Sequence, residues 1–228
     1  GQCSDDDFNR GPMAVWLERL WESLVNYKLL DTPEAVQYVS EAALAEQTKN
    51  SGKRMQRLRG KKQGAETGLH FSNARQLGLM AKQLALDHAG PVMAVLFRDA
   101  DGTRSAPGQM WQAKWDSMVN RFKSAEFDFG VPMLPKPKSE GWLLCAGQTA
   151  QHSHASLEDI SGNDNSPNSA KDQWEAFMGA PQNAALEADW CAKNPQDWSN
   201  LRTMPSFQAF YDRFHEVALA IVRPAGRS

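Results

Sequence analysis

The feature that most constrains the fold is a run of six consecutive apolar residues, Val92 to Phe97, which is followed closely by Asp99 and Asp101. A continuous apolar run bounded by polar turn residues is typical of a central strand that is buried on both faces. The run therefore predicts a buried strand with two carboxylates just beyond its carboxyl end.

Segments with the apolar spacing of a helix lie before and after this strand, and a second apolar segment predicts another strand over residues 127–134. The succession of strand, helix and strand favours an α/β fold with a parallel or mixed sheet and helices on its faces. The short run at residues 36–39 fits either a strand or a helix. Helices are expected over residues 12–28, 72–88, 109–124, from Ser139 onward, and over 171–178, 183–190 and 205–222.

The chain is long enough to bury a core as one domain, since it has 228 residues and 41% of them are hydrophobic. Residues 1–146 are expected to form the α/β core. Residues 147–170 are rich in Ser, Asn, His, Gly and Asp, which predicts a flexible loop. Residues 171–228 are expected to form a helical C-terminal extension that packs on the core.

Charge and cysteine content restrict the partners and the compartment. The 25 basic and 27 acidic residues nearly balance, so nucleic acid or a membrane would have to be met by a local patch. The three cysteines form no closely spaced pair, which argues against a disulfide framework and a structural zinc site. No apolar run is as long as a membrane helix requires. We expect a cytoplasmic protein without a membrane partner, and the start at Gly1 instead of a methionine predicts a further segment upstream.

The two aspartates predict a site for a divalent cation. In open α/β sheets the ligand crevice lies at the carboxyl ends of the strands, so Asp99 and Asp101 are expected near one point. Two carboxylates at such a short distance repel each other unless a cation is present, and Mg²⁺ prefers one or two protein carboxylates as ligands. The alternative for this motif is an ordinary turn capped by its own aspartate side chains.

Three short motifs carry a resemblance to a known family: Asp99-Ala-Asp101-Gly, Glu140-Gly-Trp142-Leu-Leu and Pro205-Ser-Phe207-Gln-Ala-Phe210. In their order along the chain they resemble the small stand-alone Toprim-like proteins of unknown function, over roughly residues 1–220. These proteins are related to the Toprim nucleases of the overcoming-lysogenization-defect type and are often encoded beside an ATPase. The resemblance implies a mostly parallel sheet with helices on both faces.

The resemblance also implies a chemistry, which is metal-dependent cleavage of phosphodiesters in DNA or RNA with Mg²⁺ or Mn²⁺. Toprim domains hold the metal with a glutamate after the first strand and with an Asp-x-Asp pair, which maps onto Asp99 and Asp101. The glutamate would precede Gly1, and Asp5 and Asp6 are nearby substitutes. The resemblance further implies an ATPase partner and a role in defence against phage. Whether the chain assembles into a homo-oligomer stays open.

Other charged residues are candidates for the same reaction. Glu140 is a candidate metal ligand or general base, and its alternative role is a helix-start carboxylate behind Ser139. Lys136 and Lys138 are candidates for contacts to the scissile phosphate, and their alternative is a solvated loop. A strongly basic stretch predicts contacts to a nucleic-acid backbone through Lys53, Arg54, Arg57, Arg59, Lys61 and Lys62. The alternative for this stretch is an exposed helix face or a loop.

Two other functional hypotheses stand beside the nuclease. One is a non-catalytic regulatory or binding subunit that keeps a Toprim scaffold. The other is an aspartyl phosphatase, because Asp99-Ala-Asp101-Gly102-Thr103 matches the motif in which the first aspartate is phosphorylated. The phosphatase ranks third, since such aspartates usually follow a first strand near the N-terminus.

Overall fold

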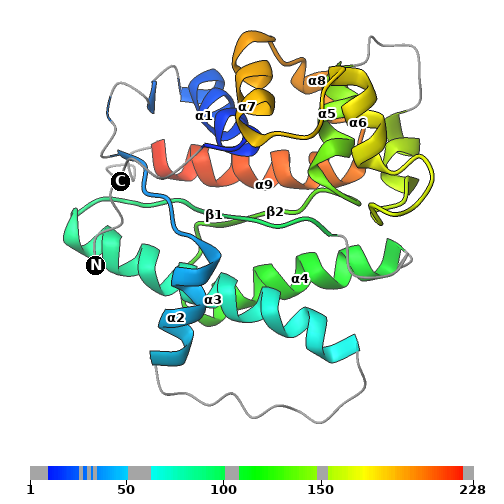
Figure 1. Ribbon diagram of the computed structural model, residues 1–228. Helices are drawn as coiled ribbons and strands as arrows, with labels where there is room; N and C mark the ends of the chain where they lie inside the picture. The colour runs from blue at the N-terminus through cyan, green and yellow to red at the C-terminus, as the bar shows by residue number, and fades with distance from the viewer. Residues whose placement is uncertain are drawn as a thin grey trace.

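The structure is a computed structural model that describes residues 10–25, 28, 29, 32, 35–50, 63–100, 108–147 and 154–222. Within these residues the chain forms an α/β fold in which a small sheet lies between two layers of helices (Figure 1). None of the helices in the described ranges is long and apolar enough to cross a membrane.

The sheet consists of two parallel strands, β1 (Ala94–Phe97) and β2 (Gly130–Met133), with Ala94 opposite Gly130 and Phe97 opposite Met133. Main-chain hydrogen bonds continue past the strands, since the Ala100 N–H donates to the Pro135 carbonyl over 3.0 Å. Helix α4 (Gly108–Ser124) joins the two strands. The predicted strand, helix and parallel strand are confirmed, and both strands end on the side where α5 begins, at the right of Figure 1.

The lower layer in Figure 1 holds α4, α2 (Glu41–Asn50) and α3 (Gln63–Asp87), which begins earlier than residue 72. Helices α3 and α4 pack on each other and on the sheet. Gly130 permits this close approach, because a Cβ atom there would lie 2.1 Å from the ring of Phe122 on α4. The apolar cluster between these helices and the sheet includes Leu44, Ala74, Ala81, Ala94, Leu96, Met118, Phe122 and Leu134.

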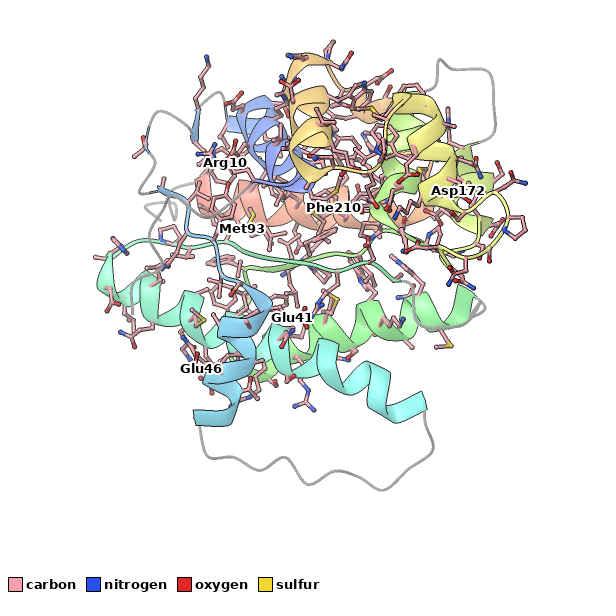
Figure 2. The ribbon with its side chains drawn as sticks, in the orientation of Figure 1. Arg10, Glu41, Glu46, Met93, Asp172 and Phe210 are labelled. Atoms are coloured by element: carbon pink, nitrogen blue, oxygen red, sulfur yellow. The ribbon has the colours of Figure 1, made fainter. Side chains whose placement is uncertain are left out.

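The upper layer contains most of the aromatic core. Trp142 is fully buried, stands with its ring centroid 4.9 Å from that of Phe207, and donates from its indole N–H to Ser206 over 2.8 Å. Phe210 lies in this layer, whereas Glu41 lies in the lower one (Figure 2). The layer consists of α1 (Pro12–Val25), α5 (Ser139–Gly147), α6 (Ala170–Met178), α7 (Ala184–Lys193), α8 (Trp198–Leu201) and α9 (Pro205–Val222).

The expected burial of the first strand on both faces holds only in part. Side chains alternate across a strand, so Ala94 and Leu96 pack into the lower cluster and Val95 packs, partly buried, against the upper core. Phe97, at the end of the strand, is 40% exposed. The strand that is buried along its whole length is β2. Only the last four residues of the apolar run, Ala94–Phe97, pair with β2, and Val92 and Met93 lie before the strand.

The segment after α5, which composition predicts to be flexible, contains a 3₁₀ helix, η4 (His154–Asp159). Leu157 and Glu158 of η4 are buried. The Glu158 carboxylate accepts a 2.6 Å hydrogen bond from the Ser206 N–H in the first turn of α9, where main-chain N–H groups lack partners within the helix. This bond attaches the segment to the upper layer.

Candidate functional site

Asp99 lies at the carboxyl edge of the sheet, directly after β1. Its Oδ1 atom accepts a 2.8 Å hydrogen bond from the Ser139 N–H, the first residue of α5. The first N–H groups of a helix need an outside acceptor, and a carboxylate there also interacts favourably with the helix dipole. Asp99 therefore connects the end of one strand to the helix that follows the other.

Lys136 and Lys138 lie in the loop between β2 and α5, and both contact acidic groups of residues 158–164. The Lys138 Nζ atom donates to the Asp164 carboxylate over 2.6 Å. The Lys136 Nζ atom lies 3.9 Å from Glu158 and 3.7 Å from Asp159. The two lysines are thus engaged in ion pairs at the same edge as Asp99, and their predicted contacts to a phosphate stay a prediction.

Glu140 is buried in the upper layer, with 4% of its surface exposed. Its Oε1 atom accepts a 2.6 Å hydrogen bond from the Gln182 side chain. The neighbouring Glu187 accepts from the Trp174 indole over 3.0 Å. Burial raises the pKa of Glu187, and the charge of Glu140 adds to this effect. The Glu140 carboxylate therefore belongs to a buried network between α5, α6 and α7.

Two residues of α4 reach the same edge from below, and neither is among the residues predicted from the sequence. The Lys114 Nζ atom donates to the Ala100 carbonyl over 2.6 Å, although Lys114 is only 2% exposed. The Trp111 indole N–H donates to the Leu134 carbonyl over 2.8 Å. The available signal in the sequence was a lysine at helical spacing among the apolar residues Trp111, Trp115 and Met118.

Several predicted site residues lie outside the described residues. They are Asp5, Asp6, Asp101 and the six basic residues Lys53, Arg54, Arg57, Arg59, Lys61 and Lys62. Within the described ranges, no group of three or more His, Cys, Asp or Glu side chains is arranged to hold a metal ion. Of the predicted metal ligands, the described residues therefore bring Asp99 to the carboxyl edge and place Glu140 in the buried network.

Comparisons of the chain with protein-family models, with curated proteins and with solved structures found no significant match. The resemblance to Toprim-like proteins accordingly rests on the short motifs of this chain.

Proposed function

We propose that the chain is a Mg²⁺-dependent nuclease with a Toprim-like fold. The observation that carries this proposal is the position of Asp99 at the carboxyl edge of a parallel strand–helix–strand unit, where ligands bind in open α/β sheets. Helices on both faces of the sheet are compatible with such a fold.

The donor chemistry at this edge suits a hard divalent cation. Mg²⁺ is commonly held by one or two carboxylates and completes its coordination with water and substrate phosphate oxygens. Asp99 would be one ligand and Asp101 the second, with a further acid from Asp5, Asp6 or a residue before Gly1. When bound, the cation would lower the pKa of a bound water and neutralise charge on the phosphate.

The cationic groups beside Asp99 would orient the phosphate. Lys136 and Lys138 already bind carboxylates of residues 158–164, and a phosphate oxygen is an acceptor of the same kind. A substrate phosphate would take the position that Asp164 holds on Lys138. The basic residues between Lys53 and Lys62 would bind the nucleic-acid backbone without regard to sequence.

The partner part of the proposal is an ATPase that controls the nuclease in defence against phage. It rests on the family resemblance alone. Copurification of a tagged chain with an ATPase encoded beside it would test this part.

The nuclease proposal is tested with plasmid DNA and tRNA, incubated with Mg²⁺ or Mn²⁺ and the wild-type chain, Asp99→Asn or the control Asp116→Asn. Asp116 is an exposed aspartate on α4, where its carboxylate accepts from Gln112. We expect cleavage by the wild type and the control, none by Asp99→Asn, and none in EDTA. Equal cleavage by all three proteins would remove Asp99 from the reaction, and no cleavage by any would favour a non-catalytic subunit.

The aspartyl phosphatase is a second candidate, and a specific observation favours it. Among the described residues, β1 is the first strand in chain order, so Asp99 follows a first strand as the phosphatase motif requires. Asp99 would then be the nucleophile and not only a metal ligand. Trapping with beryllofluoride, which mimics a phosphoryl group on a carboxylate, would label Asp99 in a phosphatase and leave a nuclease unlabelled.

A further inference from the structure

One side of the small sheet carries main-chain groups that β2 does not use. In a parallel ladder, alternate residues of a strand bond to the neighbouring strand. The Ala94 and Arg98 N–H groups donate to the main chain at β2 over 3.1 and 3.0 Å, so the even-numbered residues of β1 face β2. The N–H and C=O groups of Val95 and Phe97 therefore point to the opposite side. Among the described residues no strand lies on that side, and neither residue forms a hydrogen bond through these groups.

The outer side of β2 is closed. Gly130 and Pro132 are the residues of β2 whose main-chain groups point away from β1. The Gly130 carbonyl accepts from the Arg213 Nε atom of α9 over 3.1 Å, and Pro132 has no N–H to donate. A further strand would therefore find its hydrogen-bonding partners beside β1 and not beside β2.

The side chains at the open edge of β1 are apolar. Val95 and Phe97 lie on the same face of the strand, Val95 partly buried and Phe97 40% exposed. Proteins usually shield a free edge with charged side chains, proline or a covering segment, because such an edge pairs readily with another strand. The next residue, Arg98, does not shield the edge, since its guanidinium is bound to Glu41 of α2.

We propose that this open edge pairs with the same edge of a second copy of the chain. An antiparallel arrangement about a two-fold axis at Leu96 places Val95 of each copy opposite Phe97 of the other. In an antiparallel ladder, opposed residues exchange both hydrogen bonds at every second position, which is the spacing of Val95 and Phe97. All the outward N–H and C=O groups of both residues are then paired. The edge is thus complementary to itself, as an interface between two-fold related copies must be.

The same register covers the exposed aromatic ring. Phe97 of each copy packs beside Val95 of the other, and apolar cross-strand pairs of this kind stabilise a sheet. Ala94 stands opposite Arg98, and its small side chain leaves room for the arginine. Joining two sheets of two strands gives a sheet of four, a common size, whereas an isolated pair of strands is at the lower limit. Because the edge is short, the buried area is below that of a standard interface, and the dimer should dissociate on dilution.

The test measures self-association by sedimentation velocity over a series of protein concentrations, in the wild type, Phe97→Lys and the control Phe177→Lys. Phe177 is a phenylalanine of similar exposure, 44%, on α6. We expect the wild type and the control to dimerise equally as the concentration rises. Phe97→Lys should dimerise about 10-fold more weakly or less still, because an aromatic side chain at the centre of an interface is lost and a lysine at a strand edge opposes pairing.

A wild type that stays monomeric at every concentration overturns the proposal, and so does a Phe97→Lys variant that dimerises as the wild type does. Circular dichroism checks that each variant is folded. If Phe97→Lys does not fold, Phe97→Thr provides the comparison, since threonine suits a strand but removes the ring.

Hydrogen exchange of single amides identifies what covers the edge. The Val95 and Phe97 N–H groups should exchange slowly in the concentrated wild type, and rapidly on dilution and in Phe97→Lys. Slow exchange that does not depend on concentration would mean that a segment of the same chain covers the edge, and it would overturn pairing with a second copy. Rapid exchange of both amides in a dimer would place the interface elsewhere and overturn the proposal equally.

Discussion

Asp99 has a structural role that substitution can separate from its proposed chemistry. Its Oδ1 atom accepts from the first N–H of α5 over 2.8 Å. In Asp99→Ala that N–H loses its acceptor, and losing such a cap costs about 0.5–2 kcal/mol of stability. For a domain of this size, a loss of about 1 kcal/mol lowers the melting temperature by roughly 2–4 °C.

Asp99→Asn should behave differently, because its amide oxygen can still accept from Ser139. Only the interaction of the charge with the helix dipole is lost, which is worth about 0.3–1 kcal/mol. The order of melting temperatures should be wild type, then Asp99→Asn, then Asp99→Ala, while both variants lose metal-dependent activity.

The assay is thermal and urea unfolding followed by circular dichroism, with the exposed Asp116→Ala as the control. Equal stability of all four proteins would refute the capping role of Asp99. Equal destabilisation by the Asn and Ala variants would show that the charge matters and the hydrogen bond does not.

Three further predictions concern the charged and sulfur-containing groups around the site. Asp164→Asn removes the carboxylate paired with Lys138, so an oligonucleotide should bind more tightly in fluorescence anisotropy at fixed salt, and unchanged affinity would contradict competition at Lys138. Burial raises the pKa of Glu187, so the folded state holds this proton more tightly than the unfolded state does. The stability of the fold therefore falls as the pH rises from the pKa of the unfolded state, near 4.5, through the higher pKa of the folded state. Glu187→Gln should therefore unfold at higher urea than the wild type at pH 8 and lose the advantage at pH 4, whereas parallel pH profiles would count against it. Burial raises the pKa of both Cys145 and Cys191 to about 12, so neither thiol should react with iodoacetamide at pH 8 in the folded protein, and rapid labelling would disprove their burial.

Much of the framework was predictable because it follows from local patterns. The apolar runs and the helical spacing between them give the parallel strands and α4, and Pro205 and Val222 bound α9 as predicted. These elements have strong apolar periodicity, and the partners of α4, the strands β1 and β2, are close to it in the sequence. The position of Asp99 at the strand end follows from the same reasoning.

The parts that sequence could not provide depend on contacts between distant segments. Gln182 binds Glu140 across 42 positions, and no local pattern indicates that this glutamate faces the interior. Asp164 engages Lys138 across 26 positions, so a loop lysine that looks solvated is paired. Lys114 was overlooked because a lysine on a helix normally extends into water, whereas this one is buried and donates to the Ala100 carbonyl.

The central claim is that Asp99 binds a divalent cation at the carboxyl edge of the sheet. Anomalous diffraction from crystals soaked in Mn²⁺ tests it most directly, because the signal locates the ion without reference to activity. A peak is expected about 2.1 Å from a carboxylate oxygen of Asp99, the distance typical of a small hard divalent cation. An absent peak, with Asp99 still bound to the Ser139 N–H, would contradict it.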